Sequence, residues 1–348
     1  NVSNSVTVTV REAALSFNQT IPAGTGYDAG DTFTITYTIT NSGSVPAYNV
    51  RLADLALPAE FDLTAVNFVT TGTGGSVTDS TDLSTDSIDA ELSQMAAGST
   101  WTITATVTLR DTVNPSDVYS NPADVTFTSL PGANGTTGNA TGSDTPGAAG
   151  TATGERTGAD GVGGALNDYA LADSESLSIP NPFSVTKAAD KTTVSIGEIV
   201  TYTVQVTVIE GTTTNIVLND TLPAGMVFVA NSATLTNANG MTITGFDSNS
   251  LDQTLTSVVN PGANEGSANT TTATDTFTYT YQARVQNVVS NQSGTLLTND
   301  LDGSGDGVPP DTNNQVDVQV VEPDLVIEKS ITTPTTGLDA GDEVVYQI

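Results

Sequence analysis

Three stretches of the chain resemble one another and lie far apart in the sequence. Residues 4–15 read NSVTVTVREAAL and residues 314–325 read NQVDVQVVEPDL, and the two align without a gap. A looser copy, SESLSIPNPF, occupies residues 174–183. Repetition at this spacing predicts tandem domains of roughly 140–170 residues, each folding as one packing unit.

A second conserved block follows each of these stretches. It begins with a turn containing Gly and an acidic residue and continues as a strand, in 28–43 (DAGDTFTITYTITNSG), 195–208 (SIGEIVTYTVQVTV) and 339–348 (DAGDEVVYQI). In the first two copies a further strand ends in a Leu-Pro corner, VRLADLALPAEF at 50–61 and IVLNDTLPAGMVF at 216–228. The order of elements is therefore repeated as well as the junctions.

Apolar and polar residues alternate within these segments. The apolar side chains of the first such strand face one way and its threonines the other: Phe33, Ile35, Tyr37 and Ile39. The same period of two occurs in 199–208, 101–109 and 276–285. A strand with one apolar face packs on a one-sided core. Several such strands per unit, separated by turn signals, predict an all-β protein of tandem immunoglobulin-like Greek-key β-sandwich domains.

The repeat sets the expected domain boundaries, with partial units at both ends. We expect the last strand of a preceding unit, one full unit, a second full unit and the start of a further one, at 1–12, 13–179, 180–321 and 322–348. The first full unit contains a Gly, Ala and Thr-rich stretch at 130–168, which we interpret as a long loop. This loop is either solvated or a contact surface between neighbouring fibres.

Composition excludes several classes of function. The 348 residues contain no Cys and no His, so thiol nucleophiles, imidazole bases and ordinary zinc sites are excluded. With 39 acidic and 8 basic residues the formal charge is −31, which repels nucleic acid and anionic membranes. The same charge fits either simple solubility or cation binding. No run of residues predicts direct membrane insertion of this segment.

Three segments of the chain resemble a known family. VTKAADKTTVSIGEIVTYTVQVTV at 185–208, LNDTLPAGMVF at 218–228 and GERTGADGVGGALNDYA at 154–170 are similar to the bacterial conserved-repeat family. That family, domain of unknown function eleven, is also described as isopeptide-forming fimbrial domains. The resemblance implies an extracellular, Ig-like, multi-repeat protein of the bacterial cell surface. It also implies that some units carry internal Lys–Asn cross-links.

The second unit contains the residues that such an autocatalytic cross-link requires. Lys187 lies in its first strand, Asp220 precedes the Leu-Pro corner, and Asn299 lies in TLLTND, which we take as the last strand. A buried lysine becomes neutral and nucleophilic, and a protonated carboxyl group polarises the amide that it attacks. The alternative is a surface lysine and a turn-capping aspartate.

The first unit departs from this pattern. Asp54 and Asn121 match Asp220 and Asn299, but Asn18 or Gln19 stands where the lysine is expected. We therefore expect no cross-link in the first unit.

An acidic segment of the second unit has the spacing of a calcium-binding loop. In DLDGSGDGVPPD the oxygen donors fall at positions 1, 3, 5, 7 and 12: Asp300, Asp302, Ser304, Asp306 and Asp311. Carboxylate oxygens are the ligands that Ca²⁺ prefers. An acidic, solvated turn fits the same residues. A weaker calcium site of the same kind is predicted in the first unit at Asp160, Asn167 and Asp168.

Together these features predict a structural repeat rather than an enzyme. We expect a stiff shaft of a secreted bacterial surface fibre, fimbria or large adhesin, with neighbouring repeats or subunits of the same fibre as partners. The alternative is a ligand-binding adhesin module that grips a glycan or protein through its loops. Trp101 follows the strand alternation, so we predict that it is a core residue and not part of a binding surface.

Overall fold

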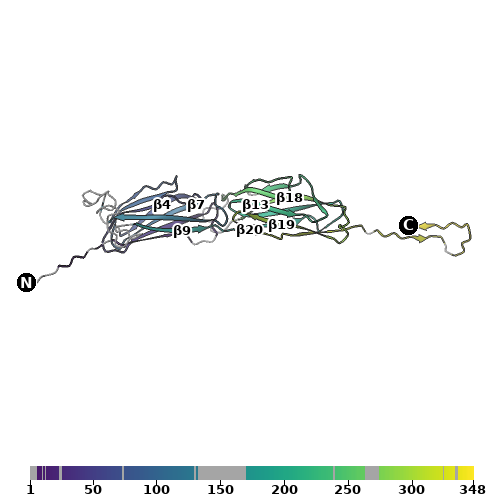
Figure 1. Ribbon diagram of the computed structural model, residues 1–348, viewed down its shortest axis with the longest axis horizontal. Coiled ribbons are helices and arrows are strands. Elements are labelled where there is room, and N and C mark those ends of the chain that lie inside the picture. Colours follow the sequence, from purple (N-terminus) through teal and green to yellow (C-terminus); the bar gives the residue numbers. More distant parts are fainter. Residues whose placement is uncertain are drawn as a thin grey trace, which may run out of the picture.

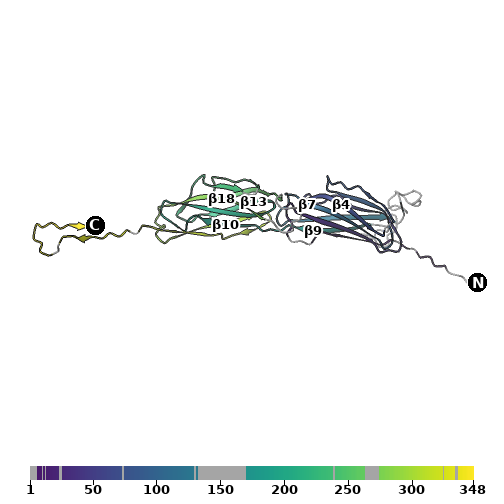
Figure 2. The ribbon, with the colours of Figure 1, turned by 180° about the vertical axis from the view of Figure 1, so that it is seen from behind.

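The computed structural model is built from strands, with no α-helix in the part of the chain that it describes. The described residues are 6–9, 11, 13–22, 26–72, 74–128, 131, 170–237, 240–262, 274–323, 325–333 and 336–348. They form two elongated units placed end to end, and a short segment continues beyond the second unit (Figure 1). The view from behind shows the same end-to-end order (Figure 2). Within the described residues no helix has the length and hydropathy needed to cross a membrane.

The first unit is a sandwich of two sheets. Its strands are β1 (Leu15–Thr20), β2 (Thr32–Asn41), β3 (Ala47–Asp54), β4 (Phe61–Thr71), β5 (Val77–Asp79), β6 (Ile88–Met95), β7 (Thr100–Leu109), β8 (Val118–Thr128) and β9 (Ala170–Ser178). One sheet has the order β1-β2-β7-β4 and the other β5-β6-β3-β8-β9. The chain crosses from one sheet to the other between β2 and β3, β3 and β4, β4 and β5, β6 and β7, and β7 and β8, as in a Greek-key sandwich.

The second unit repeats this plan. Its strands are β10 (Ser184–Ala189), β11 (Thr193–Val194), β12 (Ile199–Ile209), β13 (Gly211–Thr221), β14 (Met226–Phe228), β15 (Thr234–Asn237), β16 (Thr242–Thr244), β17 (Gln253–Asn260), β18 (Thr274–Val285), β19 (Leu296–Gly305), β20 (Val308–Asp311) and β21 (Val316–Val320). One sheet has the order β10-β12-β18-β14, with β15 beside β18. The other has the order β11-β21-β19-β13-β17-β16, with β20 beside β19.

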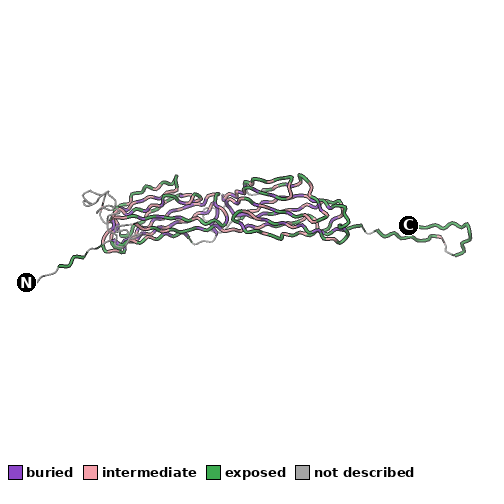
Figure 3. The backbone as a smooth tube through the Cα atoms, in the orientation of Figure 1, coloured by how far each residue is buried: buried purple, intermediate pink, exposed green. Residues whose placement is uncertain are grey.

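Alternation along the strands produces the two cores. The apolar residues of β2 are fully buried while the threonines between them are half-buried on the other face. Figure 3 shows the buried residues running along the inside of both units and the exposed ones along the outside. Trp101 is fully buried and stacks against Phe68, so its prediction as a core residue is confirmed. The predicted all-β fold of tandem Ig-like sandwiches is likewise confirmed.

Several expectations concern segments outside these two sandwiches. Residues 6–9 and 11 lie in no strand, and Val6 and Val8 are exposed. Their assignment to a preceding unit stays a prediction. Near the other end, β22 (Ser330–Ile331) pairs with β23 (Tyr346–Gln347). Apart from residue 131, the predicted long loop at 130–168 lies outside the described residues.

Candidate functional site

Lys187 enters the core of the second unit from an edge strand. It lies on β10, where it pairs with Val204 of β12. Its neighbour at the same face, Val185, is buried and packs against the other sheet close to Gly303. The Lys187 side chain is completely buried. Period-two alternation from an apolar residue therefore aims the lysine into the sandwich rather than into solvent.

Asp220 meets the lysine from the opposite sheet. It lies near the end of β13 and pairs with Leu301 of β19, two residues beyond Asn299. The Lys187 Nζ donates a hydrogen bond to Asp220 Oδ1 at 2.7 Å, and both side chains are 0% exposed. The alternative of a surface lysine is therefore wrong.

Tyr281 completes the cluster and connects Asp220 to Asn299. Its hydroxyl donates to Asp220 Oδ2 at 2.6 Å and accepts from Asn299 Nδ2 at 2.7 Å. The Tyr281 ring stacks on Tyr202, and Lys187 Nζ lies 5.1 Å and 5.6 Å from the centroids of the Tyr202 and Tyr281 rings. The fully buried Asn299 Oδ1 has no hydrogen-bond partner among the described residues.

Burial shifts both members of the ion pair toward their neutral forms. Desolvation lowers the pKa of Lys187 to about 8, although the Asp220 charge and hydrogen bond oppose the shift. Desolvation also raises the pKa of Asp220, against the opposing effect of Lys187. Both shifts favour proton transfer from the lysine ammonium to the carboxylate within this buried pair. This is the condition under which a lysine amine becomes a nucleophile.

Three members of this cluster were predicted from the sequence, and the fourth was not. Lys187, Asp220 and Asn299 all converge on one site, as predicted. Asn299 does not lie in the last strand, because β20 and β21 follow β19. Tyr281 was not singled out, although its inward position could have been found from the alternation in TFTYTYQARV, residues 276–285.

The first unit contains the same site without its lysine. Ala53 pairs with Asp124, so the next residue, Asp54, lies opposite Ala123, two residues beyond Asn121. In the second unit, Asp220 pairs with Leu301, two residues beyond Asn299. Asp54 Oδ2 accepts hydrogen bonds from the Tyr37 hydroxyl and from Asn121 Nδ2, both at 2.6 Å. The match of Asp54 and Asn121 to the second unit is therefore supported by strand register.

Gln19 occupies the lysine position, in line with our expectation of Asn18 or Gln19. The matching turns at Gly30 and Gly197 align β2 with β12, so that Tyr37 corresponds to Val204. Gln19 pairs with Tyr37 on β2, and Lys187 pairs with Val204 on β12. The conclusion that the first unit lacks the lysine is unchanged.

Gln19 is buried beside this incomplete cluster. It is 0% exposed, and neither oxygen nor nitrogen of its amide has a hydrogen-bond partner in the described part of the chain. Asp54 Oδ1 and Asn121 Oδ1 are also buried without such a partner. Burial raises the pKa of Asp54, despite the hydrogen bonds from Tyr37 and Asn121 that favour its charged form.

The predicted calcium loop at 300–311 forms a β-hairpin instead of an EF-hand-like loop. Asp300 and Asp302 lie within β19, Ser304 follows on the same strand, and Asp311 ends β20. Asp306 precedes the glycine at the turn. The loop geometry that we inferred from the spacing is therefore wrong.

Three of the four hairpin carboxylates accept hydrogen bonds from the protein, whereas Asp300 Oδ1 is buried without a partner among the described residues. Asp302 accepts from the Asn313 backbone, Asp306 from Thr214 and Asn215, and Asp311 from the Val185 backbone. No cluster of three or more Asp or Glu that could hold a metal is found among the described residues. Calcium binding by this segment stays a prediction. The second predicted calcium set, Asp160, Asn167 and Asp168, lies outside the described residues.

The joint between the units is a second candidate site, because it sets their relative position. Ile209, at the end of β12 in the second unit, is buried in the core of the first. The Thr212 amide donates to the Val113 carbonyl at 2.8 Å, and its hydroxyl donates to the Asp111 carbonyl at 2.6 Å. On the linker, Asn181 Nδ2 donates to the Gly307 carbonyl at 2.7 Å.

Glycines allow the two backbones to approach at this joint. A Cβ on Gly211 would lie 2.5 Å from the Val113 carbonyl oxygen, and one on Gly30 would overlap the Gly262 carbonyl. Both Gly211 and Gly30 have positive φ angles, of 126° and 85°. These positions therefore require glycine for two independent reasons.

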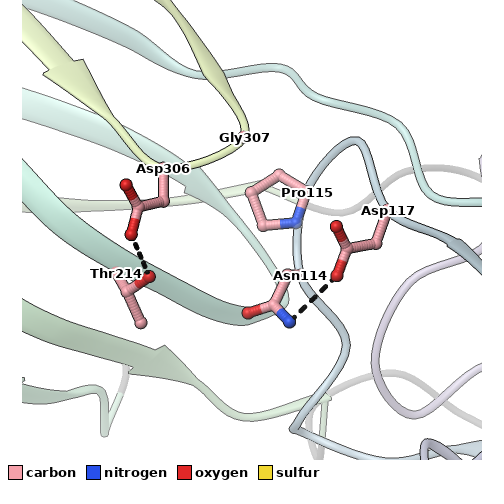
Figure 4. A pocket seen from close by; sticks show the side chains of 6 residues that line it. All are labelled: Asn114, Pro115, Asp117, Thr214, Asp306 and Gly307. Carbon is pink, nitrogen blue, oxygen red and sulfur yellow. Dashed lines mark hydrogen bonds between the residues drawn. The ribbon is translucent and has the colours of Figure 1, made fainter.

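A small pocket opens at the side of the joint (Figure 4). Its volume is about 210 Å³ and each unit contributes three lining residues: Asn114, Pro115, Asp117, Thr214, Asp306 and Gly307. In the wall from the first unit, Asn114 donates a hydrogen bond to Asp117. In the wall from the second unit, Thr214 donates one to Asp306. Ligand pockets typically measure ~300–1,000 Å³, so this one is small for an organic ligand.

Comparisons with known proteins show similarity in structure and not in sequence. No protein-family model matches the sequence, and the comparison with curated proteins found no match. A fragment of the major pilin GBS80 of Streptococcus agalactiae matches 88% of this chain and 91% of its own, at 8% identity and a TM-score of 0.30. A putative membrane-anchored protein of Corynebacterium diphtheriae matches 91% and 96%, at 9% identity and a TM-score of 0.25. The collagen-binding domain of RspB from Erysipelothrix rhusiopathiae matches 89% and 94%, at 14% identity and a TM-score of 0.23. At such low identities and scores the similarity does not extend to function.

Proposed function

We propose that the chain is a structural segment of a secreted bacterial surface fibre, in which tandem β-sandwich units form a stiff shaft. The observation that carries this proposal is the interlocked joint. Backbone hydrogen bonds, two glycine approaches and the buried Ile209 connect the units end to end. A flexible linker makes no such contacts, so the joint favours a rod over freely jointed domains.

Charge and composition support an extracellular, non-enzymatic role. The net charge of −31 keeps neighbouring shafts apart and disfavours nucleic acid as a partner. Neighbouring repeats or subunits of the same fibre are the partners that we propose. The alternative, a ligand-binding adhesin module, gains no support from the joint pocket, which is small and lined by two carboxylates.

The shaft proposal can be tested by measuring a distance between the units. The chain has no Cys, so Asn67→Cys on β4 and Thr254→Cys on β17 introduce two unique, exposed labelling sites. Spin labels at these positions should give one narrow distance distribution by pulsed EPR. A broad distribution in the unaltered joint would show that the units move independently and would overturn the proposal.

We also propose that Lys187 and Asn299 form an isopeptide bond in the second unit. The neutral Lys187 amine attacks the Asn299 side-chain carbon, and Asp220 relays the proton. A new Nζ–Cγ bond forms, the Cγ–Nδ2 bond breaks, and Nδ2 leaves as ammonia with the proton lost by the lysine. The buried Lys187–Asp220 contact and the open Asn299 carbonyl support this step.

Intact mass of the full chain tests the cross-link directly. We expect a mass about 17 Da below the calculated value, because one ammonia is lost. The Asn299→Ala chain should show its calculated mass without a deficit. An unshifted mass of the parent chain would exclude the bond and would leave the shaft proposal untouched, since the joint does not depend on it.

A further inference from the structure

The end of the first unit that meets the second unit has a counterpart at the far end of the second unit. In the first unit, Asp31 N donates to Asp28 O at 3.2 Å and Gly30 N donates to Leu109 O at 2.9 Å. In the second unit, Glu198 N donates to Ser195 O at 3.2 Å and Gly197 N donates to Val285 O at 2.9 Å. The two glycines have the same φ of 85°. The two turns are therefore built alike.

What differs is what lies against the two turns. Gly30 is in contact with Gly262 of the next unit, whereas an added Cβ on Gly197 would have no atom within 4 Å. The apolar residue of the loop after β7, Val113, is 1% exposed, because it lies in the joint. In the loop after β18, Val288 and Val289 are 39% and 90% exposed. The second unit thus presents an uncovered version of the surface that the first unit buries.

We propose that this distal end surface, formed by Gly197, Val288 and Val289, docks a further β-sandwich unit of the same kind. The occupant presents an apolar residue and a glycine-bearing turn, as Ile209 and Gly211 do at the existing joint. Four carbonyls of the 286–290 loop already accept hydrogen bonds within the second unit: those of Gln286, Val288, Val289 and Ser290. A backbone amide of the docked turn therefore donates to the Asn287 carbonyl, as Thr212 does to Val113. The docked unit therefore recognises this surface mainly through its backbone and small side chains.

The chain beyond the second unit identifies the occupant as an adjoining unit. Leu325, Ile327 and Lys329 repeat the spacing of Phe183, Val185 and Lys187. Phe183 is 9% exposed in the core of the second unit, whereas Leu325 is 85% exposed. Residues 325–329 therefore have the sequence pattern of a first strand, but their apolar side chains are exposed and not packed in a core. The inference rests on the proposed shaft function and names the surface through which the shaft continues.

The test uses a chain in which residues 183–324 are duplicated in tandem, so that a complete unit follows the distal end surface. In the parent chain, the thiol of Val289→Cys should react rapidly with a maleimide. In the duplicated chain, labelling of this first-copy position should slow at least tenfold. Val69→Cys, which lies on β4 and is half exposed, should label equally fast in both chains. Val113→Cys provides the buried reference.

A glycine substitution separates docking from folding. Gly197→Asn should leave the parent chain stable, because Asn tolerates positive φ and the position is open. In the duplicated chain it should restore fast labelling at position 289, since its Cβ would meet the docked unit.

Two results would overturn the proposal. Equal labelling rates in parent and duplicated chains would show that an adjoining unit does not dock. If maleimide labelling at position 289 slowed as the concentration of the parent chain rose, a second copy of the chain would be covering the surface instead. Neither result bears on the interdomain distance, which tests the shaft function separately.

Discussion

A single residue at one register position separates the chemistry of the two units. Lys187 and Gln19 occupy equivalent places on edge strands, paired with Val204 of β12 and Tyr37 of β2 respectively. The asparagine that the lysine would attack is retained in both units, as Asn299 in the second and Asn121 in the first. The first unit is thus a site whose nucleophile has been replaced by a side-chain amide.

Restoring the lysine should therefore create reactivity in the first unit. We expect the Gln19→Lys chain to lose one more ammonia than the parent, about 17 Da by intact mass. The buried carboxyl of Asp54, whose pKa is raised, would accept the lysine proton. Adding Asn121→Ala to the Gln19→Lys chain should abolish the extra loss. A mass deficit unchanged from the parent would show that a lysine at position 19 does not reach Asn121.

We expect Asp54 to make the first unit less stable at neutral pH than in mild acid. Burial raises its pKa in the folded state above the unfolded value, so the folded state binds more protons between the two values. The stability that Asp54 contributes is therefore present at low pH and is lost as pH rises through the folded pKa. We expect Asp54→Asn to raise the free energy of unfolding at pH 7 by about 1 kcal/mol.

The matching measurement is urea unfolding of both chains between pH 4 and pH 8. The Asp54→Asn chain should show a weaker dependence on pH than the parent, because the titrating group is gone. Identical slopes would contradict the assignment. Lowering pH also relieves repulsion among the many acidic groups, but that effect is common to both chains and cancels in the comparison.

The cross-link chemistry implied by the family resemblance predicted Lys187, Asp220 and Asn299, and pairing between strands was the part that the sequence could not predict. From the sequence, either Asn18 or Gln19 matched the position of the lysine. The choice between them depends on the register of β1 and β2, which is set by contacts with the rest of the sandwich. Tyr281 was overlooked because its hydroxyl gains a role only when Asp220 and Asn299 are brought beside it.

At the scale of elements, the segment 296–311 shows how two patterns compete for the same residues. The spacing of its carboxylates matches a calcium loop, but Leu297, Asn299 and Leu301 alternate inward as in a strand. Asp306 and Gly307 form an Asp-Gly pair, a strong hairpin signal. Burial of alternate residues in an existing core outweighs an isolated ligand pattern, and the segment folds as β19 and β20.

Calcium binding by this hairpin remains testable in the full chain. If the segment binds Ca²⁺, a calorimetric titration should give saturable heat that the Asp302→Ala substitution removes. Asp302 is chosen because it is exposed and its carboxylate accepts only one backbone amide in the described structure, that of Asn313. Equal heats from the two chains would exclude this segment as the site. Asp317→Ala, on the neighbouring β21, is a matched control for the loss of one negative charge.

At the scale of the whole molecule, the order of units was predictable and their fixed contact was not. The repeat and the short linker indicated tandem sandwiches. The joint itself is made from turns that are distant in sequence, at 28–31, 109–113 and 209–212. The recurring Gly-acidic turn was noticed as a repeat marker. Its role against the next unit emerges only once the sandwiches stand end to end.

The joint should be sensitive to one methyl-bearing side chain. Gly211→Val places a Cβ 2.5 Å from the Val113 carbonyl, at a φ of 126° that valine does not adopt readily. We expect this substitution to broaden the interunit distance distribution and to shorten the maximum dimension seen by small-angle X-ray scattering. Because each unit has its own core, both units of the Gly211→Val chain should remain folded.

Gly240→Val is the matched control for backbone strain. Gly240 also has a positive φ, of 71°, but an added Cβ there would have no atom within 4 Å. The control should therefore cost some stability in the second unit and leave the interunit distance narrow. If Gly211→Val also kept a narrow distribution, the rigidity of the rod would have to come from the linker at 179–183 rather than from the close contact of turns. The two sources predict different fibres: a linker-based rod tolerates changes in the turns, whereas a contact-based rod requires glycine wherever two units meet.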